Sequence, residues 1–306
     1  MMQAVGVNDE TIKRVGGVRV MRNTRERATK LVLVVMIAGA TLAAGETRKE
    51  FRYTVGHNAS ISISNQYGPI SVKPAPGNQV VVSAVLASDK VEIDASQNGD
   101  RVDIVSHLLP DATADSARVE YDVQVPSDAS VSLHSVSGVL HAERLHGDVT
   151  LEGASANVDV HDISDAHVHV KTMNGPVTLV NIKQGHVEIA SVSGDVTLHS
   201  VSGSFVQVNS TSGKINYDGD FGGAGRYLLT SHSGDIEATA PGYASIDVVA
   251  RSEKGSVEND FPLQPEHTSF VVKAGSAFAG TVGKAASSVK LFSFSGKIHL
   301  KKKQSQ

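Results

Sequence analysis

The residues best suited to chemistry in this sequence are histidines and carboxylates that recur at a fixed interval. Asp148, His167 and His186 lie 19 residues apart. The residues two positions further on complete the pattern: Thr150, His169 and Glu188. If the segments that carry them stack as strands about 4.8 Å apart, two imidazoles and nearby carboxylates would come within reach of one zinc or copper ion. The alternative is a solvated ladder of polar side chains, because stacked repeats bring like residues together without forming a site. We favour the ladder and assign no metal ligand.

A repeated unit between Leu133 and Leu300 must position these side chains. Its phrase is a small polar residue, Gly, any residue and then an apolar–polar–apolar triplet, as in the run from Ser193 to Leu198. The phrase-defining positions, 18 to 21 residues apart, are Gly138, Ala156, Gly175, Gly194, Gly213, Gly234, Gly255, Gly275 and Gly296. A unit of this size holds two short strands and cannot bury an apolar face alone, so it must stack on copies of itself.

The apolar columns of the repeat predict how the units stack. Val149, Val168, Val187 and Val206 are 19 residues apart, and period-two alternation turns them inward. The sequence therefore predicts an all-β fold, a β-solenoid of about nine coils of 19–21 residues with two short strands per coil. A propeller blade needs about 40 residues, and the similarity of each single unit argues against it. We expect the repeated glycines to take positive φ where each strand turns a corner.

Both ends of the solenoid should be protected from pairing with other chains. Residues 46–128 alternate in period two and are expected to form a β-rich N-terminal part that caps one end, with the repeats following over residues 129–300. At the other end we expect like charge on the last coil and on the basic tail 301–306. The lysines concerned are Lys297, Lys301, Lys302 and Lys303.

Residues 1–45 have the layout of a secretory signal. An apolar run at residues 31–45 follows a basic segment and ends in small residues, and Met21 is a plausible true start. The run is shorter than the roughly 20 residues of a membrane span, although an uncleaved N-terminal anchor is the alternative. Without residues 1–45 the chain keeps 21 basic and 29 acidic residues, an acidic balance that disfavours nucleic-acid binding. The absence of cysteine excludes disulfides and a lipid-anchoring cysteine.

One stretch of the chain carries a family resemblance. The run from Val119 to Pro126, then the run from Val131 to Gly138 and the later Ser-Gly-Asp phrases, resembles the DUF4097 family of adhesin-like bacterial β-solenoid proteins. The resemblance covers roughly residues 50–300 and implies a protein that is exported or tethered to a membrane. The family has no established reaction, so the resemblance implies no catalytic residues.

These observations lead to an expected function of exported, non-enzymatic binding. No catalytic or nucleotide-binding motif is found, and we assign no catalytic residue and no cofactor. The expected partner is an envelope component, a polysaccharide or a second copy of the chain, in the periplasm or at the cell surface. The alternatives are a polymerising envelope scaffold and, less favoured, a polysaccharide-acting enzyme on the same scaffold. Tight corners leave little chain for an enzyme's cleft.

Overall fold

The structure is a computed structural model that describes residues 46–222, 224–263 and 276–303. All of them belong to one compact unit, and the signal predicted at residues 1–45 and the phrase at Gly275 lie outside the described residues. The described strands are β1 (Thr47–Thr54), β2 (Ser60–Tyr67), β3 (Ile70–Pro74), β4 (Gln79–Leu86), β5 (Val91–Asn98), β6 (Arg101–Leu108), β7 (Val119–Val125), β8 (Ser130–Glu143), β9 (Val149–His161), β10 (His167–Thr172), β11 (Val177–Val180), β12 (Gly185–Ser191), β13 (Val196–His199), β14 (Gly203–Ser210), β15 (Ile215–Asp218), β16 (Arg226–Ser231), β17 (Ile236–Ala240), β18 (Ile246–Ser252), β19 (Val257–Asn259), β20 (Ala277–Val282), β21 (Ser287–Ser293) and β22 (Ile298–Lys302).

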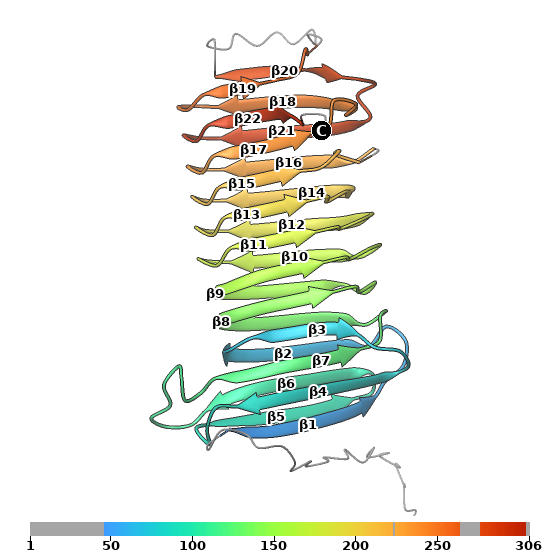
Figure 1. Ribbon diagram of the computed structural model, residues 1–306, viewed down its shortest axis with the longest axis vertical. Helices are drawn as coiled ribbons and strands as arrows, with labels where there is room; N and C mark the ends of the chain where they lie inside the picture. The colour runs from blue at the N-terminus through green and yellow to red at the C-terminus, as the bar shows by residue number, and fades with distance from the viewer. Residues whose placement is uncertain (1–45, 223, 264–275, 304–306) are drawn as a thin grey trace, which may run out of the picture. The chain divides into compact units, whose positions relative to one another are not determined.

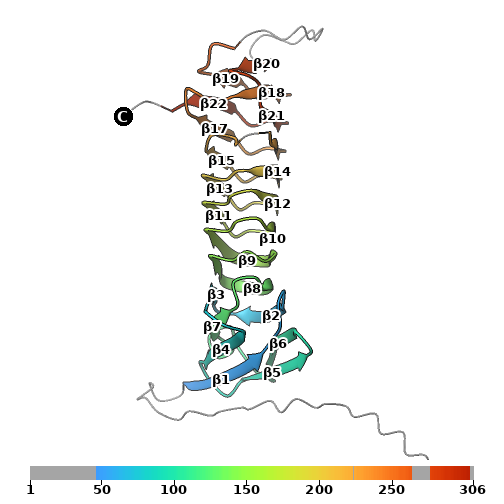
Figure 2. The same cartoon turned by 90° about the vertical axis from the view of Figure 1, so that its right-hand side faces the viewer.

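The fold is all-β, with one large and mostly parallel sheet that curves round an axis in a solenoid-like manner (Figure 1). Two opposed faces enclose the core, as Figure 2 shows edge-on. Face A contains β10, β12, β14 and β16, which pair in parallel and in that order. Face B contains β11, β13, β15 and β17, which pair in the same way. We call one strand of face A with the next strand of face B a coil. Among the described residues no helix is long and apolar enough to cross a membrane.

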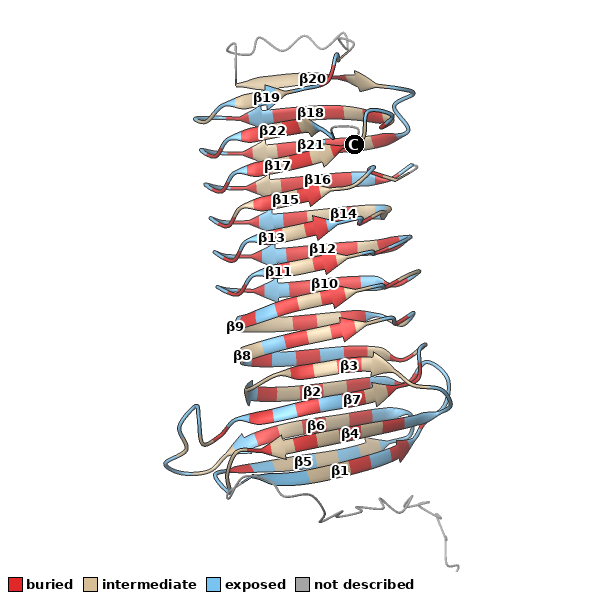
Figure 3. Ribbon diagram, in the orientation of Figure 1, coloured by how far each residue is buried: buried red, intermediate tan, exposed pale blue. Residues whose placement is uncertain are grey.

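The predicted valine columns are confirmed. Val149, Val168, Val187 and Val206 pair in register along face A, and each is at most 1% exposed. Buried and outward residues alternate along every strand of the two faces (Figure 3). The core is narrow and consists mainly of Val, Ile and Leu, because each coil contributes only a few inward side chains.

Both ends of the stack contain coils that are out of sequence order. The coil of β21 and β22 lies between the coil of β16 and β17 and the coil of β18 and β19. At the other end, β2 pairs with β6 on one side and β8 on the other, and β3 lies between β7 and β8. The outer edges are then covered by antiparallel strands: β5 on β6, β4 on β7 and β20 on β18. Each covering strand satisfies backbone groups that would otherwise be free to pair with another chain.

The prediction that C-terminal lysines guard the last exposed edge is wrong. Strand β22 is paired on both sides, so it has no free edge to guard. Lys297 lies 2.7 Å from a Glu258 carboxylate oxygen, and Lys301 lies 2.9 Å from one of Glu237. Their charges neutralise carboxylates of neighbouring coils on face B.

The repeated glycines also serve a different purpose from the one predicted. Of the phrase glycines that the structure describes, only Gly138 has positive φ, at 134°. The others are required because the backbones of successive coils approach closely. A Cβ at Gly175 would lie 1.7 Å from the Ala156 carbonyl oxygen, and one at Gly194 would lie 1.9 Å from the Gly175 oxygen. The left-handed conformation recurs at the opposite corner, mostly in residues other than glycine, such as Asp162, Asn181 and Ser200.

A buried hydroxyl stabilises each tight corner next to these glycines. The hydroxyl belongs to the residue three positions before the glycine, and it forms a hydrogen bond with the backbone of that glycine. The Ser191 hydroxyl donates to the Gly194 carbonyl at 2.8 Å, and the Ser231 hydroxyl accepts from the Gly234 N–H at 2.8 Å. The buried hydroxyl residues at these corners are Thr172, Ser191, Ser210, Ser231, Ser252 and Ser293. In three coils the residue that follows the hydroxyl residue is an exposed apolar side chain: Met173, Val192 and Phe294.

Replacing Ser191 with alanine should lower the free energy of unfolding by about 1–2 kcal/mol, because the Gly194 carbonyl would lose a buried hydrogen bond that water cannot replace. Urea unfolding at constant pH measures the change. Ser204→Ala is the matched control, since Ser204 is exposed and its hydroxyl has no partner among the described residues. Equal stability of the two variants would contradict the role given to the corner hydroxyl.

Candidate functional site

The histidine column predicted on one face is present on face A. His167 and His186 pair in register, and their rings meet edge to face with centroids 5.1 Å apart. The backbone N–H of His167 donates to an Asp148 carboxylate oxygen at 3.0 Å, and the His167 ring Nδ1 lies 3.9 Å from the same carboxylate, so Asp148 stacks on this column as predicted. Thr150, His169 and Glu188 form the neighbouring column.

The side chains of the column satisfy one another. Glu188 lies 3.1 Å from His186 Nε2 and 3.5 Å from His169 Nδ1. The hydrogen bond from His186, followed by the charges of His186 and His169, holds the pKa of Glu188 below its ordinary value. Over the described residues, no group of three or more His, Asp or Glu side chains is arranged to hold a metal ion. The geometry is that of an exposed ladder of imidazoles and carboxylates that contact one another.

Glu188→Gln should remove a pH-dependent part of the stability. Because the pKa of Glu188 is lower in the folded chain than its ordinary 4.5, the pair stabilises the fold above about pH 4.5 and loses this effect as pH falls through the folded value. The side chain is about half exposed, so we expect less than about 1 kcal/mol. The difference in urea midpoint between wild type and variant should be present at about pH 6 and shrink at about pH 3. A difference independent of pH would contradict the assignment.

A second histidine cluster lies on face B, and sequence reasoning missed it. Asp159 is held between two imidazoles, with His161 Nε2 at 2.6 Å and His141 Nδ1 at 3.0 Å. The signal was available, because His141 and Asp159 are 18 residues apart and occupy matching positions in β8 and β9. On both faces, therefore, histidines and carboxylates are paired with each other.

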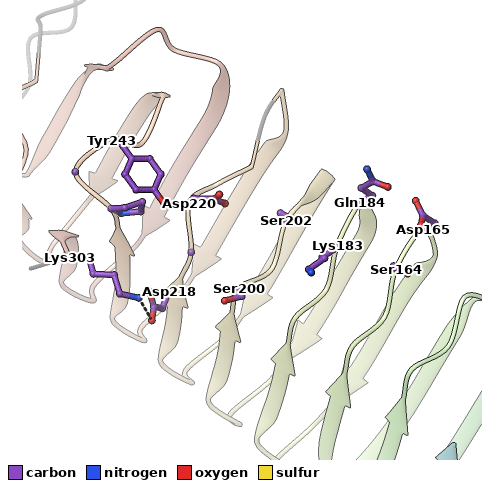
Figure 4. Close-up of a pocket in the computed structure, with 13 residues that line it drawn as sticks. Ser164, Asp165, Lys183, Gln184, Ser200, Ser202, Asp218, Asp220, Tyr243 and Lys303 are labelled. Carbon is purple, nitrogen blue, oxygen red and sulfur yellow. Dashed lines mark hydrogen bonds and ion pairs between the residues drawn. The ribbon is translucent and has the colours of Figure 1, made fainter. Parts of the chain in front are cut away.

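A groove at one corner of the stack has a different character. It has a volume of about 890 Å³ and runs along the loops that lead from face B to face A (Figure 4). We call it the corner groove, and its lining residues are Ser164, Asp165, Lys183, Gln184, Ser200, Ser202, Asp218, Gly219, Asp220, Pro241, Gly242, Tyr243 and Lys303. One ion pair crosses it, between Lys303 Nζ and Asp218 at 3.1 Å.

Left-handed backbone shapes the corner that carries this groove. Asp162, Asn181 and Ser200 have φ between 54° and 56°, and Asp165 and Gln184 have φ of 57° and 53°. Such a turn reverses the chain within a few residues. Between its two left-handed positions it buries one apolar residue, Ile163 or Ile182, and leaves the next, Ser164 or Lys183, accessible to solvent. The Asn181 amide donates to the Asp162 carboxylate of the preceding coil at 3.0 Å, which keeps successive turns in step.

Several polar side chains of the corner groove lack a protein partner. Among the described residues, nothing hydrogen-bonds or ion-pairs with the side chains of Asp165, Lys183, Gln184, Ser200 and Ser202. Sequence reasoning missed this groove because it looked for charge on the flat faces. A weak signal existed in the 19-residue spacing of Ser164 from Lys183 and of Asp165 from Gln184.

The chain matches one known protein family and resembles two solved structures at low sequence identity. The model of the Toastrack DUF4097 family matches residues 58–301. A "putative cell adhesion protein" from Clostridium sporogenes is 13% identical, with a TM-score of 0.29, over 84% of this chain and 100% of that one. A "putative adhesin" from Bacteroides fragilis is also 13% identical, with a TM-score of 0.44, over 86% of this chain and 100% of that one. No curated protein sequence matches the chain.

Proposed function

Since the chain belongs to the Toastrack DUF4097 family, we propose that it is an exported, non-enzymatic binding protein of the cell envelope. The observation that carries the proposal is the repeated, unpaired polar surface at one corner of the stack, where successive coils offer hydrogen-bonding groups to solvent. A stack of this kind can contact an extended partner at several coils at once, and several weak contacts together give useful affinity.

Two features support binding over catalysis. The histidines and carboxylates of the faces are well hydrated, with the side chains of Asp148 and Glu188 59% and 46% exposed. Enzymes gain most of their electrostatic advantage in sites that exclude water. From β10 to β15 the loops at both corners are only three or four residues long, so this part of the stack provides little material to enclose a substrate.

Export and architecture in finer detail belong to the same proposal. Residues 1–45 would act as a secretory signal or remain as an N-terminal tether, placing the chain in the periplasm or at the cell surface. The repeat would comprise about nine coils of 19–21 residues. N-terminal sequencing of the protein recovered from fractionated cells tests export, with a start near residue 46 as the expected result. A cytoplasmic protein with residues 1–45 intact would overturn it.

Binding is tested by chemical crosslinking in intact cell envelopes together with sedimentation of the purified chain. We expect crosslinked adducts with envelope material and a monomer in solution. Sedimentation that shows polymers growing with concentration, without such adducts, would overturn the binding role in favour of an envelope scaffold. A chain that forms neither adducts nor polymers would also contradict the proposal.

A further inference from the structure

We propose that the corner groove binds a linear oligosaccharide whose chain runs along the stack from coil to coil. This inference rests on the binding role proposed above and names the ligand class of the same surface. Its starting point is the contrast between the groove and the two faces. On the faces, most histidines pair with carboxylates, as His186 does with Glu188, whereas five polar side chains of the groove have no partner among the described residues.

The free groups of the groove are of mixed kind. Lys183 offers an ammonium donor, Asp165 a carboxylate acceptor, and Gln184 an amide that both donates and accepts. The hydroxyls of Ser200 and Ser202 can also act in either sense. A simple anion or cation would meet repulsion from one part of this set. A sugar hydroxyl donates one hydrogen bond and accepts others, so a polyol can satisfy all of these groups together.

Tyr243 supplies the apolar element that sugar recognition needs. It is 81% exposed, the highest value among the large hydrophobic residues that the structure describes, and it lies at the edge of the groove beside Asp220 (Figure 4). A tyrosine ring held in water offers an apolar face to the C–H groups of a pyranose, and its hydroxyl remains free to form a hydrogen bond. Tyrosine is also one of the residues enriched at binding interfaces.

The direction of the ligand follows from the repeat. Residues of successive coils succeed one another along the groove, with Ser164 next to Lys183 and Asp165 followed by Gln184 one coil later. Neighbouring coils are about 4.8 Å apart, so a linear polymer laid along the groove meets a new set of donors and acceptors at each step. The groove extends from the coil of Ser164 to that of Tyr243, which favours an oligosaccharide over a single sugar.

The test is binding of the full chain to immobilised linear oligosaccharides of at least four sugars, both neutral and uronate-containing. We expect wild-type protein to bind at least one class, and Tyr243→Ala and Lys183→Ala each to weaken that binding at least tenfold. Met173→Ala is the matched control, because Met173 is 55% exposed at the opposite corner and should leave binding unchanged. Both groove residues are exposed, so unchanged thermal midpoints will confirm that the variants are folded.

The outcomes separate this inference from the proposed function. Equal binding by wild type and both groove variants, or loss on Met173→Ala alone, would place the sugar elsewhere and overturn the groove assignment. Envelope adducts without oligosaccharide binding would overturn the ligand class and leave the binding role standing. If adducts and oligosaccharide binding are both absent, both proposals fail.

Discussion

Gly194→Ala is expected to lower the free energy of unfolding by about 3 kcal/mol or more, or to prevent folding. The added Cβ would lie 1.9 Å from the Gly175 carbonyl oxygen and 2.6 Å from its carbon. Backbone cannot move aside as a flexible side chain can, because Gly175 is itself packed against Ala156 of the coil before it. The coils would have to separate at this corner, which would lengthen the hydrogen bonds of neighbouring strands. Urea unfolding and soluble yield measure the effect.

Gly242→Ala is the matched control for this prediction. At that position the new Cβ would meet only the Lys302 side chain, with Cε at 2.9 Å, and this chain end can rotate away. We expect a change within about 0.5 kcal/mol, as for most surface substitutions. If Gly194→Ala proved as stable as Gly242→Ala, close backbone approach would not be the reason for the repeated glycines.

Tyr217→Ala is expected to cost about 3–5 kcal/mol, the range for removal of a large buried aromatic side chain. Tyr217 is 1% exposed and stacks on Phe221, with centroids 4.2 Å apart. It also meets Tyr227 edge to face at 5.8 Å. These three rings fill the core next to the end of the corner groove. In the neighbouring coils, aliphatic side chains fill the core instead. Calorimetry or urea unfolding should show the loss.

Tyr217→Phe separates packing from hydrogen bonding at the same position. The Tyr217 hydroxyl donates to the Val201 carbonyl at 2.9 Å and accepts from the Phe221 N–H at 3.0 Å. Phenylalanine keeps the ring but leaves both backbone groups unpaired, so we expect a loss of about 1–3 kcal/mol, smaller than for alanine. Burial raises the pKa of the Tyr217 hydroxyl well above its ordinary value, so the hydroxyl remains protonated in the folded chain. Equal losses for both variants would assign the whole effect to the hydroxyl.

The sequence predicted the class of fold because its strongest signal is local. Val168 and Val187 are 19 residues apart, and a spacing repeated at a constant value has one economical explanation, direct stacking. The same uniformity concealed the order of the coils. Gly255 and Gly296 carry nearly interchangeable phrases, so either could follow Gly234, and in the structure the later one does. The choice depends on which strands must cover the edges, which is a property of the assembled stack.

The candidate site was harder to predict for a related reason. Histidines are easily recognised as candidate ligands in a sequence. The column at His167 and His186 does form, but its side chains contact one another and Glu188. The corner groove depends on left-handed turns at residues such as Asn181 and Gln184, which are not glycines and so do not stand out as left-handed positions. Tyr243 is far from Ser164 and Lys183 in the sequence. Only the stacking of the coils brings its loop to the same groove.

The interleaved strands near residues 246–302 make the attachment of two strands depend on a later part of the sequence. Among the described strands, β18 is hydrogen-bonded to β20 and β21, and β19 to β22, so neither attaches directly to the coil of β16 and β17. In the folded stack, β18 and β19 are therefore joined to the coil of β16 and β17 only through β21 and β22, which come later in the sequence. Loss of residues 287–302 would remove the strands through which β18 and β19 attach to the stack, although the sequences of β18 and β19 would be intact.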